Sequence, residues 1–296
     1  MAAPRYHAAV KSHAASARLS VLGAALLFST GGAAIKGTTL GGFQVAGFRS
    51  AVAALAIALL LPEARRGLGP RLVPAALAYA ATLVSFVVAT KLTTAAAAIF
   101  LQSTAPIWVL LLSPLLLGER IRARDLPFVA LAAGGLLLVF LGSRDPAATA
   151  PRPALGNALA LASGLFYGVM IMAMRHLAST PDHPDRSLAA MVMGNAFAFA
   201  ACLPLALPVA TLTLHDAAAI LYLGAIQIGL AYWLFTHGLR SLSALEVSLL
   251  ALLEPVLNPL WTWLVHGERP SALALAGGAV MLAAVAARTL IDQRRG

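Results

Sequence analysis

Charged side chains are scarce in this sequence. Only 11% of its 296 residues are Asp, Glu, Lys or Arg, against 60% hydrophobic residues, and the mean hydropathy is +0.85. A soluble domain carries roughly 25% charged residues, so this chain has too little charge to cover a water-exposed surface. The composition excludes a soluble globular protein and predicts a chain that crosses a lipid bilayer many times.

Cysteine and the residue patterns of enzymes are also nearly absent. The single cysteine, Cys202, lies within an apolar run, which leaves no disulfide framework and no cysteine metal site. None of the seven histidines is spaced with an acidic residue as in a buried metal pair. Metalloprotease, serine-hydrolase and Gly-rich phosphate-binding motifs are missing. We therefore expect no enzyme activity, no cofactor and no metal.

Acidic residues are outnumbered by basic ones, 11 to 21, and the formal net charge is +10. Nucleic-acid binding requires basic residues gathered on one face or in one run, whereas here they are scattered one to three per loop. We expect no nucleic-acid partner. The basic residues instead indicate how the chain is oriented in the membrane.

Ten apolar segments are present, each near the ~20 residues that a membrane-spanning helix needs. They cover 19–38, 43–62, 71–91, 93–117, 126–142, 154–174, 187–208, 214–237, 243–265 and 271–291. Runs such as 51–61 and 128–141 are apolar on every face, which favours helices over the alternating pattern of barrel strands. The predicted fold class is an all-α membrane protein with ten transmembrane helices.

The distribution of Lys and Arg predicts both termini on the cytoplasmic side. Basic residues in short loops accumulate on that side of the membrane. With a cytoplasmic N-terminus, fifteen basic residues fall in cytoplasmic segments and five on the opposite side, and Arg49 lies inside a span. Residues 1–18 resemble the charged start of a signal peptide, but no convincing cleavage site follows, so we expect a retained first helix.

Two internal repeats divide the chain into halves of five spans. Leu22 and Gly23 recur as Leu155 and Gly156, at a shift of 133. At a shift of 149, Pro106 matches Pro255, and the Gly-Glu-Arg of 118–120 matches that of 267–269. Because five is odd, equivalent helices must cross in opposite directions, which is the inverted repeat common among secondary transporters.

The repeats predict the following division of the chain. A cytoplasmic segment covers 1–18, the first five-helix repeat 19–142, a periplasmic linker 143–153, the second repeat 154–291 and a cytoplasmic tail 292–296.

These motifs resemble the drug/metabolite transporter superfamily, specifically its EamA-type bacterial exporters. The resemblance covers about 19–291 and is carried by Glu254-Pro255 and the two Gly-Glu-Arg copies. Among the members, the chain is most similar to exporters of aromatic and other neutral amino acids. It departs from the nucleotide-sugar and triose-phosphate branches, because the intramembrane Lys and Arg that their substrate sites need are nearly absent here. The resemblance implies a multi-pass protein of the bacterial inner membrane that exports small metabolites.

Two charged and two proline residues at membrane depth are candidates for gating or coupling. A charge at the centre of a span costs ~2.5 to 3.5 kcal/mol on insertion scales, so Arg49 and Glu254 need partners, and their depths allow an ion pair. Glu254 is then either a proton-linked or gating carboxylate, or a helix-packing group. Pro106 and Pro255 predict bends near the midplane, which act either as hinges or as static kinks.

Neutral polar side chains at mid-depth are candidates for substrate binding or for helix packing, because facing lipid they would be unsatisfied. They include Tyr79, Thr82, Gln102, Tyr167, Gln227 and Asn258. Such a cavity, with one carboxylate and one arginine, suits a neutral zwitterion with an apolar side chain. The alternatives are an exporter of other small metabolites or drugs, a non-transporting receptor, or an intramembrane enzyme. The sequence indicates no oligomeric state.

Overall fold

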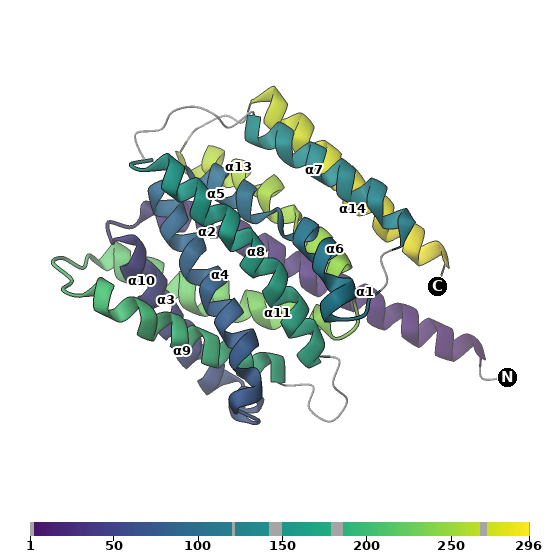
Figure 1. Cartoon of the computed structure of the whole chain (residues 1–296), viewed down its shortest axis with the longest axis horizontal. Coiled ribbons are helices and arrows are strands. Elements are labelled where there is room, and N and C mark those ends of the chain that lie inside the picture. The colour runs from purple at the N-terminus through teal and green to yellow at the C-terminus, as the bar shows by residue number, and fades with distance from the viewer. Residues whose placement is uncertain (1–2, 120–121, 142–149, 179–185, 267–270, 296) are drawn as a thin grey trace.

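The structure is a computed structural model of the chain, and it describes residues 3–119, 122–141, 150–178, 186–266 and 271–295. All regular structure within these ranges is helical (Figure 1). The all-helical membrane fold expected from the apolar segments is therefore confirmed. Among the described residues, seven helical stretches are long and apolar enough to cross a membrane: Ala15–Gly37, Gly42–Leu60, Pro70–Leu92, Ala95–Leu116, Pro153–Ala178, Arg186–Ala206 and Leu214–Leu239.

The first half of the chain forms seven helices and three short 3-10 turns. The helices are α1 (Ala3–Ser29), α2 (Gly31–Gly37), α3 (Gly42–Leu60), α4 (Val73–Leu92), α5 (Ala95–Gln102), α6 (Ala105–Leu116) and α7 (Leu126–Leu141). The turns are η1 (Pro62–Arg65), η2 (Pro70–Leu72) and η3 (Ala123–Asp125).

The second half forms seven α-helices and one π-helix. These elements are α8 (Pro153–Ala178), α9 (Arg186–Ala206), α10 (Leu214–Leu221), the π-helix η4 (Tyr222–Leu230), α11 (Ala231–Leu239), α12 (Ala244–Leu250), α13 (Leu253–His266) and α14 (Ala272–Arg295). The three predicted spans missing from the seven long ones correspond to α7, to α12 with α13, and to α14. The count of ten spans stays a prediction.

The packing of the helices is nearly unchanged when the two halves are exchanged. Helix α4 packs against α8 and α9, and its counterpart in the repeat, η4 with α11, packs against α3 and α1. Likewise α5 and α6 pack on α8, whereas α12 and α13 pack on α1. The pairs α3–α9 and α7–α14 each join equivalent helices. This is the pattern that a twofold relation between the halves produces.

Helices α7 and α14 run side by side at the edge of the bundle (Figure 1). Their backbones touch at Gly135, where an added Cβ would lie 2.8 Å from the carbonyl oxygen of Gly277. Small residues of this kind let helices approach closely in lipid, where there is no hydrophobic force to press them together. The two helices therefore pack by close backbone contact. They lie at the edge of the bundle, so the other helices form its centre.

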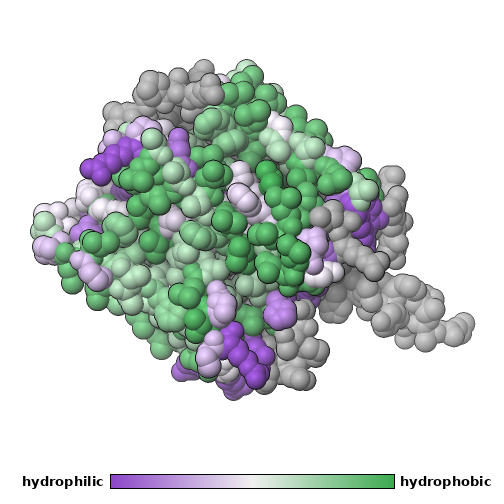
Figure 2. Space-filling model, in the orientation of Figure 1, coloured by the Kyte–Doolittle hydropathy of each residue, from purple (hydrophilic) through white to green (hydrophobic). Residues whose placement is uncertain are grey.

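The outer surface exposes many large apolar side chains. Leu55 is 62% exposed, Leu59 71% and Leu115 80%. Figure 2 shows hydrophobic atoms across the middle of the visible face and hydrophilic ones mainly near its margins. In water so large an apolar surface would drive association. In a bilayer it is the surface that contacts lipid tails.

Polar contacts join helices at both ends of the bundle. At one end, the ion pairs Arg18–Glu246 (2.8 Å) and Arg175–Glu119 (3.4 Å) each join the two halves. Lys36 marks the other end, because it lies 18 residues after Arg18 on the continuous path of α1 and α2, which is about 27 Å of helix. There its ammonium group donates to the carbonyl oxygen of Thr93 (2.7 Å).

Candidate functional site: a buried polar cavity between the two halves

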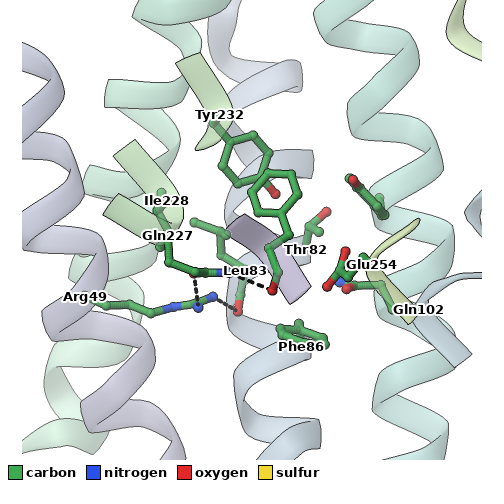
Figure 3. A pocket seen from close by; sticks show the side chains of 11 residues that line it. Arg49, Thr82, Leu83, Phe86, Gln102, Gln227, Ile228, Tyr232 and Glu254 are labelled. Atoms are coloured by element: carbon green, nitrogen blue, oxygen red, sulfur yellow. Dashed lines mark hydrogen bonds between the residues drawn. The ribbon is translucent and has the colours of Figure 1, made fainter. Parts of the chain in front are cut away.

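A small cavity lies in the centre of the bundle, between helices of both halves (Figure 3). It is lined by Phe28, Arg49, Thr82, Leu83, Phe86, Gln102, Tyr167, Gln227, Ile228, Tyr232 and Glu254. The structure thus brings together six of the ten residues that the sequence analysis named. These are Arg49, Thr82, Gln102, Tyr167, Gln227 and Glu254.

The cavity is closed in this conformation. No lining residue is more than 8% exposed, the value for Gln102. The cavity volume is about 30 Å³, which is enough for roughly two water molecules. A pocket that holds a small organic ligand is typically ~300 Å³ or more. A substrate can therefore enter only after the helices around the cavity move apart.

The expected ion pair between Arg49 and Glu254 is not formed. The Arg49 guanidinium donates to the side-chain oxygen of Gln227 and to the carbonyl oxygen of Leu83, both at 3.4 Å. In Figure 3 Arg49 and Glu254 lie on different sides of the cavity, with Leu83 between them in the view. Both residues line the same cavity. The direction in which each side chain points could not be predicted from the sequence, because it depends on how each helix is rotated.

Gln227 lies on the π-helix η4, an element that no sequence pattern announced. Its amide oxygen accepts from Arg49, and its amide nitrogen lies 3.5 Å from the carbonyl oxygen of Phe28. The wider π-helical turns occur mostly as single bulges at functional sites. Gly224 on the same element allows α3 to approach, since an added Cβ would lie 2.6 Å from the carbonyl oxygen of Arg49. The π-helix therefore holds Gln227 and Arg49 together.

Gln102 ends α5 and binds across to the second half. Its amide nitrogen donates to the hydroxyl of Ser163 on α8 (2.7 Å), and that hydroxyl in turn donates to the carbonyl oxygen of Thr82 (3.2 Å). Gly164 allows this contact, because an added Cβ would lie 2.7 Å from the carbonyl oxygen of Leu101. Gln102 therefore both lines the cavity and joins α4, α5 and α8. The hydroxyl of Thr82 donates a hydrogen bond to the carbonyl oxygen of Ala78 (2.8 Å).

Glu254 lies in the first turn of α13, with its carboxylate in the cavity (Figure 3). A carboxylate is favoured there because the N-terminus of a helix carries a partial positive charge. Within the described residues, no hydrogen bond or ion pair to this carboxylate is present. Glu254 is thus a 7%-exposed acid whose surroundings are the cavity and the start of its own helix.

Pro106 and Pro255 were expected to bend continuous helices, but they do not. The fourth and ninth predicted spans are each broken into two helices, and each proline lies in the first turn of the second one. A proline fits that turn well, because its missing N–H would have no partner there anyway. Neither proline lines the central cavity. Pro106 instead borders a smaller space beside α7, with Val129 and Leu252.

Tyr79 and Asn258 are buried close to the cavity but do not line it. The hydroxyl of Tyr79 accepts from the side-chain nitrogen of Asn195 (3.1 Å), and its ring contacts that of Tyr232 at 4.8 Å between centroids. Asn258 packs beside Gly32, where an added Cβ would lie 3.0 Å from its side-chain oxygen. Tyr79 therefore supports the wall of the cavity, and Asn258 supports the approach of α13 to α2.

Three aromatic residues of the cavity wall, Phe28, Phe86 and Tyr232, were not among the residues predicted from the sequence. Phe28 and Tyr232 contact each other with ring centroids 4.7 Å apart, and Phe86 lies on α4 beside them in the lining. One signal was available, because Phe86 and Phe235 occupy the same position in the repeat. Among the described residues no group of three or more His, Cys, Asp or Glu could hold a metal ion. The arrangement offers hydrogen bonds, one cation, one carboxylate and aromatic surface.

A buried polar cavity between two similar halves of a helical membrane protein is typical of membrane transporters. Comparison with known proteins identifies the family. The model of the EamA-like transporter family matches the chain twice, over residues 15–141 and 154–289. The chain belongs to the EamA-like transporter family, within the drug/metabolite transporter superfamily, whose members are transporters of small molecules and not enzymes.

Two individual proteins are similar over nearly the whole chain. A Pseudomonas aeruginosa protein described as uncharacterized, PA1977, is 34% identical over an alignment of 267 residues, and the match covers 85% of this chain and 88% of the relative. A protein known from a crystal structure, described without an activity, has a TM-score of 0.75 at 24% identity and covers 95% of this chain and 98% of its own. The second similarity concerns the fold alone.

Proposed function

We propose that this transporter exports neutral or aromatic amino acids across the bacterial inner membrane by alternating access. The observation that carries the proposal is the composition of the central cavity. One guanidinium and one carboxylate face it from different sides, and Phe28, Phe86, Tyr167 and Tyr232 supply aromatic surface. A zwitterion with an apolar side chain matches that arrangement. A phosphorylated substrate would need more positive charge, and a dicationic drug more negative charge.

Closure of the cavity at both ends supports alternating access. Ion pairs join the halves at the end of Arg18 and Glu246, and hydrogen bonds to backbone carbonyl groups join helices at the end of Lys36 and Lys91. Opening one end at a time would expose the cavity to one side of the membrane. The breaks between α5 and α6 and between α12 and α13 are the places where a helix can change direction at least cost.

The proposed topology is ten spans in two inverted halves, with both termini in the cytoplasm. Segments that the charge distribution assigns to the cytoplasm meet at one end of the bundle, where Arg18, Glu119, Arg175 and Glu246 are paired. The two separate matches of the family model, on either side of residues 142–153, support the two-repeat division. The same end then forms the cytoplasmic gate.

Flux from proteoliposomes tests the proposal. Purified protein is reconstituted with a panel of labelled substrates, including L-phenylalanine, L-alanine and L-aspartate, and efflux is measured with and without a pH gradient. We expect efflux of the neutral amino acids and little of aspartate. Efflux of unrelated metabolites or cationic dyes, without amino acids, would favour the alternative of a drug or metabolite exporter. No flux of any of these compounds would favour a non-transporting receptor.

A further inference from the structure

Arg49 is a buried cation with no carboxylate beside it. It is 1% exposed and lies in the middle of α3. The two ion pairs seen within the described residues, Arg18–Glu246 and Arg175–Glu119, do not involve it. A buried charge is costly unless it is paired or well hydrogen-bonded. Arg49 therefore lowers the stability of this conformation, and a functional role would explain why a charge is present here.

The hydrogen bonds that Arg49 makes are few and long. A guanidinium has five N–H donors, and here one nitrogen reaches Gln227 and another Leu83, both at 3.4 Å. Ordinary N–H to oxygen hydrogen bonds are nearer 2.9 to 3.0 Å. The Nε of Arg49 has no hydrogen-bond partner within the described residues. Most of the binding capacity of this side chain is thus unused by the protein.

The guanidinium faces the cavity, and a second lining residue has a polar group without a hydrogen-bond partner in the described part of the chain. Figure 3 shows Arg49 reaching into the space between Gln227, Leu83 and Phe86. The hydroxyl of Tyr167, on α8, also lines the cavity without a hydrogen-bond partner in the part of the chain described. Unpaired donors that line a transporter cavity are donors available to its substrate.

We propose that Arg49 binds the carboxylate of the transported substrate and thereby selects for molecules that carry one carboxylate and an apolar body. This inference rests on the proposed function and adds to it the orientation of the substrate. The carboxylate replaces the long contacts to Gln227 and Leu83 with two parallel N–H to oxygen bonds, the geometry that a guanidinium fork favours. The apolar body then lies against Phe28, Phe86 and Tyr232.

The cavity argues against the other anions that a guanidinium binds. A phosphate group carries nearly two negative charges, while the same cavity already contains the Glu254 carboxylate and only one cation. Two carboxylates on one substrate would meet the same repulsion. A monocarboxylate is balanced by Arg49 alone. A cation on the same substrate can face Glu254 at the other side.

A binding assay with three matched probes tests the proposal on the full-length protein in detergent. The probes are L-phenylalanine, 3-phenylpropionate, which lacks the ammonium group, and phenethylamine, which lacks the carboxylate. Thermal stabilisation of the protein is measured against probe concentration. We expect L-phenylalanine and 3-phenylpropionate to stabilise the protein at concentrations at least about tenfold below those that phenethylamine requires. A tenfold difference is the size expected from the free energy of a hydrogen bond to a charged group.

Two variants test whether Arg49 produces the preference for probes that carry a carboxylate. Arg49→Gln should weaken binding of the two carboxylates by about tenfold to a hundredfold and leave phenethylamine unchanged. Gln227→Glu should place a carboxylate beside Arg49 within the protein, raise the melting temperature and abolish binding of both carboxylate probes. The second variant keeps the test usable if the first does not fold. Arg71→Gln, which removes an exposed charge on η2, should change neither binding nor stability.

The outcomes separate this inference from the proposed function. Equal stabilisation by 3-phenylpropionate and phenethylamine, stabilisation by phenethylamine alone, or stabilisation by no probe would overturn the role of Arg49. So would full carboxylate binding by Gln227→Glu. If labelled L-phenylalanine crosses proteoliposomes equally well with Arg49→Gln, the function stands and the inference fails. If 3-phenylpropionate binds through Arg49 but no amino acid is transported, the inference stands and the proposed amino-acid substrate fails.

Discussion

The two broken helices at the centre of the bundle share a backbone plan but differ in chemistry. In the first half α5 begins after Thr94, whose hydroxyl accepts from the backbone N–H of Ala97 (3.1 Å). In the second half α12 begins after Ser243, which caps Glu246 in the same way at 3.2 Å. Thr94 and Ser243 are 149 residues apart, the shift of the sequence repeat. Pro106 and Pro255 start the following helices at the same shift.

Two polar residues that face the cavity, Gln102 and Glu254, do not repeat. Gln102 corresponds to Ala251, and Glu254 corresponds to Ala105. The first half therefore contributes an amide from the end of α5, and the second half contributes a carboxylate from the start of α13. In the proposed alternating access, the caps and helix breaks of both halves would serve the rocking of one half against the other. The asymmetric cavity matches the proposed zwitterionic substrate, whose two ends carry different charges.

Adding an acid in the first half, at the position equivalent to Glu254, should have the largest effect. Ala105 is 1% exposed at the start of α6 and does not line the cavity. Ala105→Glu buries an unpaired carboxylate, which should cost on the order of 3 to 5 kcal/mol and abolish most folded protein in detergent. Folded yield and melting temperature measure this. Leu116→Glu, at a position 56% exposed near the end of α6, is the control and should fold. A stable Ala105→Glu would show that the two starts are interchangeable.

Removing the acid from the second half should alter coupling more than folding. Because Glu254 forms no ion pair with Arg49, Glu254→Gln strands no guanidinium, and the melting temperature should stay within a few degrees of the wild type. Efflux down the amino-acid gradient should persist, while its stimulation by a pH gradient should be lost. Glu63→Gln, on η1, controls for removal of an acid elsewhere. A full response to pH in Glu254→Gln would exclude the coupling role.

The two caps should be equally important. Thr94→Ala and Ser243→Ala each leave a backbone N–H without its side-chain acceptor, and each should cost about 1 kcal/mol. Melting temperatures of the two variants should fall by similar amounts, and Thr94→Ser should retain the wild-type value. If only one of the two alanine variants is destabilised, the equivalence of the broken helices holds for sequence and not for energy.

An effect no larger than that of a cap is expected at an ion pair that only the second broken helix has. Glu246 pairs with Arg18, whereas its counterpart in the repeat is Ala97. Both side chains are 13% exposed, so Glu246→Ala should cost about 1 kcal/mol, the upper end for exposed pairs, and the loss should shrink at high salt. Arg18→Gln should cost the same, and the double variant should cost no more than either single one. Additive losses would show that the pair does not join the halves.

The sequence predicted the scaffold better than the site. The repeat at 149 residues located both broken helices, and the family followed from Glu254-Pro255 and the Gly-Glu-Arg motif, whose second copy lies outside the described residues. The breaks themselves were predicted as bends, because a proline in a long apolar run fits a kink and a first turn equally well.

Which side chains contact each other was harder to predict from the sequence than the scaffold. Position along a span predicts depth in the membrane, and the four residues Arg49, Gln102, Gln227 and Glu254, which were chosen on that basis, line one cavity. The partner of Arg49 depends on helix rotation, and the π-helix η4 turns Gln227 toward it in a way that α-helical spacing does not describe. Residues with no polar atom, such as Phe28 and Phe86, gave no chemical reason to be chosen.

Cysteine labelling tests the central claim, that two equivalent halves cross the membrane in opposite directions around the cavity. In a Cys202→Ala background, single cysteines replace Arg122, after α6, and Ser271, before α14. An impermeant thiol reagent is applied to intact cells and then to opened ones. We predict that the cysteine at Ser271 is labelled in intact cells, and the cysteine at Arg122 only after the cells are opened. Labelling of both positions from the same side would contradict the inverted arrangement.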